Sequence, residues 1–183
     1  MRVISGKYRG KRLEAPEGYE VRPTMDRIKE TIFNIIQFRI ESKTVLDLFA
    51  GTGALGIEAI SRGAAEVVFI DNSSDSINCI KNNLKKIDGN YKVIKTDFSN
   101  YLLSLGKKFD IIFIDPPYKS LNGEEAIKII IERRLLSDDG IIVFERSSDH
   151  ETDYEALLGD MVDLVAVRNK KMGPISADLI EWK

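Results

Sequence analysis

The chain has 183 residues, of which 43% are hydrophobic and 31% charged, and its formal net charge is −2. This length predicts one domain, and the composition excludes a disordered or fibrous protein. One cysteine and one histidine exclude an internal disulfide and the usual zinc ligand sets, so we expect no metal site. We find no signal-peptide pattern and no run of the roughly 18 apolar residues that a membrane span needs. We therefore expect a cytoplasmic protein without a membrane partner.

The first residues form a basic segment on an otherwise acidic chain. Residues 1–13 contain Arg and Lys at five positions and no acid. Two short strands, 2–5 and 11–15, are predicted around a turn at 6–10 that carries Tyr8. Such a segment suits phosphate binding, but an exposed hairpin that only keeps the protein in solution has the same composition. Charge alone leaves both interpretations open.

A helix follows this segment, and a regular alternation of strands and helices follows the helix. Thr24 is expected to cap a helix that runs to about Phe38. Strands are then predicted at 45–49, 66–70, 91–95, 109–114 and 140–145, with helices at 54–61, 75–87, 100–105 and 124–133. Caps are expected at Ser73 or Ser74 and at Asn122. This alternation predicts parallel strands, helices on both faces, and ligands at the carboxyl edge of the sheet.

The tail departs from the alternation. Two consecutive strands, 161–168 and 175–182, predict an antiparallel hairpin around residues 169–174. The fold class is therefore α/β, with a doubly wound, mostly parallel seven-stranded sheet that ends in an antiparallel hairpin. We divide the chain into an N-terminal extension of hairpin and helix, 1–43, and one compact domain, 44–183.

A glycine turn between the first strand and its helix predicts a cofactor site. In Asp47-Leu-Phe-Ala-Gly-Thr-Gly53, glycines let the backbone turn tightly and let a ligand approach the following helix N-terminus. Gly51-x-Gly53-x-x-Gly56 also fits a dinucleotide fingerprint, with Asp71 further along. Asp47 favours a ligand that carries an ammonium group, such as S-adenosylmethionine, over a pyrophosphate.

A second motif, Asp115-Pro-Pro-Tyr118, follows the fourth predicted strand. Prolines have restricted φ and no N–H, so they present the Asp115 carboxylate and the Pro116 carbonyl as two fixed acceptors. Tyr118 adds an aromatic ring. Two acceptors and a ring suit the exocyclic amine of a flat base, although a strand-ending turn with a polar first residue would look the same. Hydrogen bonds to both N–H groups would aim the nitrogen lone pair at a methyl group, and the carboxylate would stabilise the positive charge that develops.

Together the two motifs resemble the class I, Rossmann-like amino-methyltransferases. The fuller pattern resembles the 16S ribosomal RNA guanine-N2 methyltransferases of the RsmD type. It includes Arg2-Val-Ile-Ser-Gly-Lys-Tyr-Arg-Gly-Lys-Arg-Leu13, Arg22-Pro-Thr-Met-Asp-Arg-Ile-Lys-Glu30 and Leu55-Gly-Ile-Glu-Ala-Ile-Ser-Arg-Gly63. The resemblance covers essentially the whole chain. It implies transfer of a methyl group from S-adenosylmethionine to N2 of a guanine in 16S ribosomal RNA, free or within an assembling 30S subunit.

The resemblance also implies roles for particular residues. The methionine part of the cofactor would contact Asp47, Gly51 and Gly53, the ribose would contact Asp71, and the adenine would contact Asp97 and Phe98. Phe49 would also bind the cofactor. Both Asp71 and Asp97 precede helices, so helix capping is the alternative. Asp115, Pro116 and Tyr118 would be catalytic. RNA would be bound by Lys7, Tyr8, Arg9, Lys11, Arg12, Arg22 and Arg27.

Three other functions share part of this pattern. A protein amide-nitrogen methyltransferase uses a similar Pro-Pro-Tyr motif, usually with Asn where this chain has Asp115, and needs no basic hairpin. An NAD-binding oxidoreductase would explain the glycines but not Asp47 or the terminal hairpin. A catalytically silent RNA-binding module would bind RNA without turnover. Glu145, at the end of the fifth predicted strand, receives no role.

Overall fold

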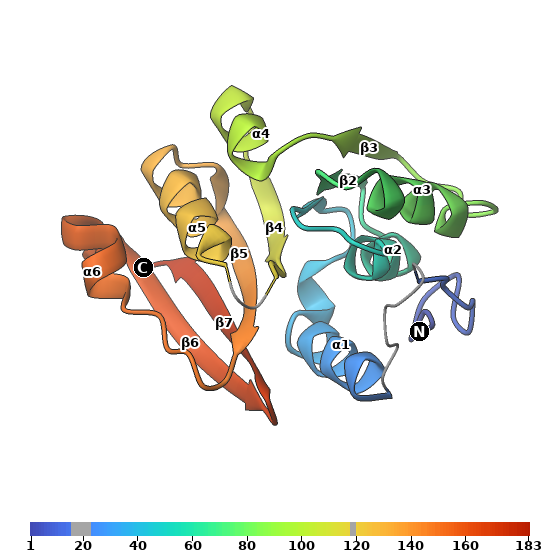
Figure 1. The fold of residues 1–183 in the computed structure, drawn as a ribbon, viewed down its shortest axis with the longest axis horizontal. Helices are drawn as coiled ribbons and strands as arrows, with labels where there is room; N and C mark the ends of the chain where they lie inside the picture. The colour runs from blue at the N-terminus through green and yellow to red at the C-terminus, as the bar shows by residue number, and fades with distance from the viewer. Residues whose placement is uncertain (16–22, 118–119) are drawn as a thin grey trace.

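A computed structural model describes residues 1–15, 23–117 and 120–183, and it contains a single seven-stranded sheet among them (Figure 1). The strand order is β3-β2-β1-β4-β5-β7-β6, and β7 runs antiparallel to the other six strands. The strands are β1 Thr44–Asp47, β2 Glu66–Asp71, β3 Tyr91–Lys95, β4 Phe109–Ile114, β5 Leu136–Ser147, β6 Val165–Met172 and β7 Ile175–Trp182. The mostly parallel sheet with an antiparallel C-terminal hairpin is therefore confirmed.

Helices cover both faces of this sheet. They are α1 Pro23–Ile35, α2 Ala54–Ser61, α3 Ser74–Asn83, α4 Phe98–Ser104, α5 Asn122–Glu132 and α6 Tyr154–Leu158, with 3₁₀ turns at Gln37–Arg39 and Gly159–Leu164. In Figure 1, α1, α2 and α3 lie on one side of the strands and α4, α5 and α6 on the other. None of the helices in the described part of the chain is long and apolar enough to cross a membrane.

Alternation along the strands divides the core into two layers. Val45 of β1 packs in one apolar cluster with α1, α2 and α3, whereas Leu46 packs in the other with α4 and α5. Successive strand residues point to opposite faces, so each buried strand supplies both clusters. Val3, Leu13 and the apolar face of α1 belong to the first cluster. The division of the chain after Lys43 stays a prediction.

The predicted N-terminal hairpin does not form two strands. An isolated antiparallel bridge joins Arg2 to Arg12. The backbone N–H groups of Ile4 and Ser5 instead donate to the carboxylate of Glu58 on α2, at 2.7 and 3.0 Å. The two arms still pair through backbone hydrogen bonds from Val3 to Lys11 and from Leu13 to Met1, whereas a side chain more than 50 residues away accepts from Ile4 and Ser5.

Other element boundaries also differ from the sequence prediction, and α1 and α3 end earlier than predicted, at Ile35 and Asn83. The turn predicted at 137–140 lies within β5, and residues 161–164 form part of the 3₁₀ turn before β6. The tail loop is consequently reduced to Gly173 and Pro174 between β6 and β7. The helix predicted from residue 100 starts at Phe98, capped by Asp97. Asn122 is the first residue of α5 and not its cap.

Candidate active site

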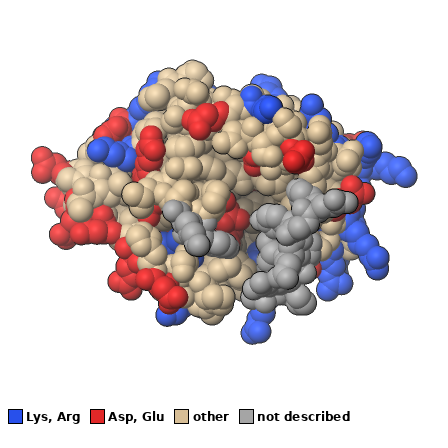
Figure 2. Space-filling model, in the orientation of Figure 1, with Lys and Arg blue, Asp and Glu red and all other residues tan. Residues whose placement is uncertain are grey.

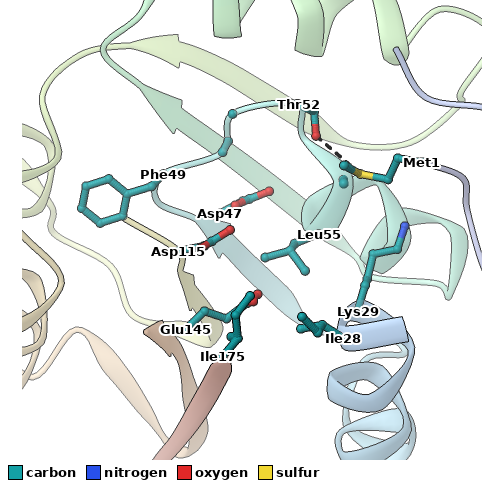
Figure 3. A pocket seen from close by; sticks show the side chains of 13 residues that line it. Met1, Ile28, Lys29, Asp47, Phe49, Thr52, Leu55, Asp115, Glu145 and Ile175 are labelled. Atoms are coloured by element: carbon teal, nitrogen blue, oxygen red, sulfur yellow. Dashed lines mark hydrogen bonds between the residues drawn. The ribbon is translucent and has the colours of Figure 1, made fainter. Parts of the chain in front are cut away.

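A cavity lies at the carboxyl edge of the sheet, where β1, β4 and β5 end side by side (Figure 3). The glycine turn, the residue after β4 and the first helix all contribute to its walls. The lining residues are Met1, Ile28, Lys29, Asp47, Phe49, Ala50, Gly51, Thr52, Ala54, Leu55, Asp115, Glu145 and Ile175. The two sequence motifs, which are separated by residues 54–114, therefore meet at one cavity.

Asp47 both stabilises the start of α2 and lines the cavity. It is only 2% exposed, and its Oδ2 accepts a hydrogen bond from the backbone N–H of Gly56 at 2.9 Å. That N–H belongs to the first turn of α2, whose cap position is Gly53 and has no side chain to offer. Asp47 thus caps α2 from the neighbouring strand and still lines the cavity.

The glycines bring α2 against the sheet. Gly53 has φ +77°, in the left-handed region, and starts the helix. A Cβ on Gly56 would lie 2.2 Å from the ring of Phe69 on β2, so any larger residue would push the helix away from the strand. Close packing of helix and strand is one reason for glycines in this kind of turn.

Asp71 ties the glycine turn to the end of β2. Its Oδ2 accepts the N–H of Gly51 at 2.8 Å and its Oδ1 accepts the N–H of Ser73 at 2.8 Å. The cap of α3 is Ser73, as expected from the sequence, so Asp71 does not occupy the cap position. Each carboxylate oxygen can still accept a second hydrogen bond.

Asp97 and Phe98 lie beyond the lining of the cavity. Asp97 caps α4, because its Oδ1 accepts hydrogen bonds from the N–H groups of Ser99 and Asn100. A further bond from the Ser99 hydroxyl contributes most to lowering the pKa of the Asp97 carboxyl, and the two N–H bonds add to this effect. Phe98 packs against Phe49, with ring centroids 5.1 Å apart. Phe49 lines the cavity, so this aromatic pair connects the glycine turn to the start of α4. A cofactor role for Asp97 stays a prediction.

Asp115 follows β4 directly and lines the cavity beside Asp47. Pro116 is buried, and its ring lies where the N-terminus of α5 packs, 3.0 Å from a Cβ built on Gly123. The carbonyl of Pro117 accepts from Ser120. The backbone around Asp115 is thus held by both the prolines and the helix that follows. Tyr118 lies outside the described residues.

Three carboxylates and one amine surround the cavity. In Figure 3 the side chains of Asp47, Asp115 and Glu145 are directed into the same space, and Lys29 approaches from α1. Burial raises the pKa of Asp47 and of Asp115 to about 7. Burial, and then the charges of Asp115 and Asp47, raise the pKa of Glu145 well above its usual value. The space between them therefore favours a cationic ligand.

Lys29 is a site residue that our sequence reasoning missed. It is 4% exposed, and burial lowers the pKa of its amine. Its Nζ donates to the carbonyl of Arg2 at 2.6 Å and lies 3.5 Å from Glu58. Its spacing from Ile32, Phe33 and Ile36 places it in the apolar stripe of α1, and a lysine in such a stripe could have been recognised in the sequence as a buried cation. Glu145 was noticed in the sequence, and the structure places it at the cavity.

The basic residues expected to bind RNA fall into three groups. Lys7, Tyr8 and Lys11 contact the end of α3 and its loop: Nζ of Lys7 lies 3.4 Å from Asp88, the Tyr8 hydroxyl accepts from the Asp88 N–H, and Nζ of Lys11 donates to the carbonyl of Lys85. Three arginines have exposed side chains, namely Arg9, Arg12 and Arg27. Arg22 lies outside the described residues.

Comparison with known proteins places the chain in a family. The family described as "Conserved hypothetical protein 95" matches residues 1–180. The chain is 40% identical over 167 residues to the putative rRNA methyltransferase YlbH of Bacillus subtilis, covering 88% of this chain and 90% of that protein. It is 37% identical over 146 residues to ribosomal RNA small subunit methyltransferase D of Escherichia coli K12, covering 79% of this chain and 74% of that protein.

Solved structures agree with this placement. The putative methyltransferase yhhF of Escherichia coli superimposes with a TM-score of 0.84 at 30% identity, over 100% of this chain and 98% of that one. SMU.776, a putative methyltransferase whose structure contains SAH, has the same core fold, with a TM-score of 0.67 at 17% identity over 87% of this chain and 50% of that one. The chain therefore belongs to the conserved hypothetical protein 95 family, the RsmD-type family that its motifs resemble.

Proposed function

We propose that this protein transfers a methyl group from S-adenosylmethionine to the exocyclic N2 of a guanine in small-subunit ribosomal RNA. The observation that carries the proposal is the meeting of Asp47, Asp115 and Glu145 at one cavity beside the glycine turn. The relatives named as ribosomal RNA methyltransferases support it, since they match most of the chain.

The cavity fits the proposed cofactor chemically. S-adenosylmethionine carries an ammonium group and supplies a methyl group on a positively charged sulfur. Ionised Asp47, with Oδ2 held by Gly56, would pair with the ammonium group. Gly51 leaves the backbone open to close approach, since a Cβ there would meet nothing nearer than 4.0 Å, and Asp71, at the end of β2, would accept the ribose hydroxyls.

Asp115 would act on the nucleophile. The lone pair of an exocyclic guanine amine is delocalised into the ring, so the amine attacks poorly unless it is held pyramidal. Hydrogen bonds to the Asp115 carboxylate and the Pro116 carbonyl would hold it so, and Tyr118 would stack on the base. Once the nitrogen has gained the methyl group, it must lose a proton. A carboxylate whose pKa is about 7 can accept that proton at neutral pH.

The partner would be 16S ribosomal RNA, alone or within an assembling 30S subunit, and the reaction would take place in the cytoplasm, where subunits are assembled. A direct test incubates the purified protein and methyl-labelled S-adenosylmethionine with undermethylated 16S RNA, with undermethylated 30S particles and with a protein extract. We expect label in RNA. Label in protein alone, or calorimetric binding of NAD instead of S-adenosylhomocysteine, would exclude the proposal.

A further inference from the structure

A second depression lies next to the reaction cavity, between α1 and the turn that joins β6 to β7. In Figure 1 the tip of the β6–β7 hairpin and helix α1 border the same end of the molecule. The groove encloses about 460 Å³ and is lined by Arg27, Ile28, Thr31, Lys170, Lys171, Met172, Gly173 and Pro174. Its two walls are therefore more than 130 residues apart in the sequence.

The charge of this groove is opposite to that of the reaction cavity. Arg27, Lys170 and Lys171 are all exposed, and the described lining contains no carboxylate. Ile28, Met172 and Pro174 contribute apolar groups to the same lining, and Thr31 adds a hydroxyl. Cations beside an apolar floor suit a sugar–phosphate backbone, because the phosphates are anionic and the sugars are partly apolar.

Lysines on an outer strand have a simpler explanation. β6 is the last strand of the sheet, and lysines on such strands prevent two sheets from pairing edge to edge. That explanation accounts for Lys170 and Lys171 but not for Arg27, which reaches the same groove from α1. It also leaves the position of the groove unexplained.

The groove adjoins the reaction cavity. Ile28 lines both of them, and the consecutive residues Pro174 and Ile175 line one each. A chain lying in the groove would therefore lead to the edge where Asp115 and Glu145 lie. A nucleotide next in sequence to the chain in the groove could then enter the cavity.

The side of the molecule around α6 is acidic and therefore unsuited to RNA. The segment after β5, through α6 and the second 3₁₀ turn, exposes six carboxylates, and Figure 2 shows Asp and Glu gathered over that side of the molecule. These residues are Asp149, Glu151, Asp153, Glu155, Asp160 and Asp163. RNA would be repelled from this side, which favours approach over α1, the β6–β7 turn and the basic N-terminal segment.

We propose that the groove formed by Arg27, Thr31 and residues 170–174 binds the sugar–phosphate backbone of the substrate RNA next to the target nucleotide. The proposal rests on the proposed function, since it assigns the binding surface for the same substrate. Arg27 belongs to the basic region of the sequence, whereas nothing in the sequence pattern distinguished Lys170 and Lys171 from a turn.

The test compares two double variants with equal charge change. Lys170→Ala/Lys171→Ala removes two cations from the groove. Lys107→Ala/Lys108→Ala removes two exposed lysines at the amino end of the central strand β4, where their surface ion pairs with Glu66 and Asp138 contribute little stability. Binding of unmodified 16S RNA is measured by fluorescence anisotropy at several salt concentrations, and binding of S-adenosylhomocysteine by calorimetry.

We expect the groove variant to bind RNA more weakly and its slope of log affinity against log salt to flatten by roughly 1.5 units, about 0.7–0.9 per phosphate contact. The Lys107/Lys108 variant should retain the wild-type slope, and Lys170→Arg/Lys171→Arg should restore it. Unchanged cofactor binding will show that the groove variant is folded.

The outcomes separate this inference from the proposed function. If wild-type protein methylates RNA and the groove variant keeps wild-type RNA affinity and salt slope, the groove is not part of the RNA-binding surface. An equal loss in both double variants would show that only total charge matters, which also overturns the inference. If wild-type protein neither binds nor methylates the RNA, the proposed function itself fails.

Discussion

At the scale of single residues, two carboxylates of the site also hold the local structure together. Asp47 caps α2 and lines the cavity, and Asp71 holds Gly51 while it remains able to accept further hydrogen bonds. The sequence reasoning found both residues because each places a carboxylate at or near the end of a buried strand. It missed Lys29, whose importance depends on Glu58 and Arg2, contacts that no local pattern contains.

Asp115 carries the most specific prediction. Asp115→Ala should lower turnover by roughly 10²–10⁴, because both the hydrogen bonds to the amine and the proton acceptor are lost. Affinity for S-adenosylhomocysteine should change little. Single-turnover rates at saturating RNA check the first expectation and calorimetry the second.

Asp138→Ala provides a matched control, since that carboxylate is 93% exposed and lies at the start of β5, away from the cavity. Its rate should equal that of the wild type. A near wild-type single-turnover rate in the Asp115 variant would show that Asp115 has only a structural role.

Asp47 predicts a dependence of stability on pH. Burial raises its pKa from 3.8 to about 7, so between these pH values the folded protein holds a proton that the unfolded chain has released. This stabilisation is complete below pH 3.8 and is lost as the pH rises through about 7. Stability of the free protein should therefore fall with rising pH, by at most about 1.4 kcal/mol per pH unit for this group.

Urea unfolding from pH 4 to 8 measures the slope. Asp47→Asn cannot ionise and should flatten it, whereas Asp163→Asn, at a side chain 91% exposed, should not. Binding of the ammonium-bearing cofactor favours ionised Asp47, so it should also release protons near pH 7, which calorimetry in buffers of different ionisation enthalpy detects. An Asp47→Asn variant that retains the full slope would assign it to other groups.

At the scale of elements, the order of strands and helices followed from hydrophobic alternation and turn residues. The errors lie where a distant partner decides the local structure. The alternation and glycines of residues 2–15 predicted two strands, but the arms pair only in part, because Glu58 and Ser61 of α2 take the backbone hydrogen bonds of Ile4 and Ser5. The beginnings of β5 and β6 were likewise set by pairing with β4 and β7, which no local pattern reveals.

Glu58 should therefore be a main determinant of stability. It is fully buried and accepts from the Ile4 and Ser5 N–H groups and from Arg62, beside Lys29. Glu58→Ala leaves these donors and a buried cation without their partner and should cost roughly 3–5 kcal/mol, measured by urea unfolding.

Glu58→Gln retains one acceptor and should cost less than the alanine variant. The control Glu132→Ala, at an exposed position at the end of α5, should stay within about 0.5 kcal/mol of wild type. If Glu58→Ala also stays within that range, the N-terminal segment is held by other contacts.

At the scale of the whole molecule, the strand order determines where the cavity lies and the surface is divided into a basic and an acidic side. The strand order brings β1, β4 and β5 together, so the cavity forms where their carboxyl ends meet. Figure 2 shows basic side chains gathered on the side of the N-terminal segment and α3, opposite the acidic side of α6. The exposed members include Arg2, Lys7, Arg9, Arg12, Lys81, Lys85 and Lys86.

This polarity predicts that the N-terminal arginines add to RNA binding. Arg9→Ala/Arg12→Ala should weaken RNA binding and flatten the salt slope by about 1.5 units, because up to two phosphate contacts are lost. Cofactor affinity should be unchanged. Titrations of 16S RNA at several salt concentrations check this, and retention of both affinity and slope would mean that the N-terminal segment serves only to cover α2 and α3.

The proposed function requires Asp115, in its cavity, to direct a methyl group to N2 of a guanine in ribosomal RNA. The most direct measurement digests undermethylated 16S RNA and 30S particles to nucleosides after reaction and analyses them by mass spectrometry. We expect N2-methylguanosine with wild-type protein and at least a hundredfold less with Asp115→Ala at equal time. A product methylated at another atom or base, or equal yields from both proteins, would contradict the account.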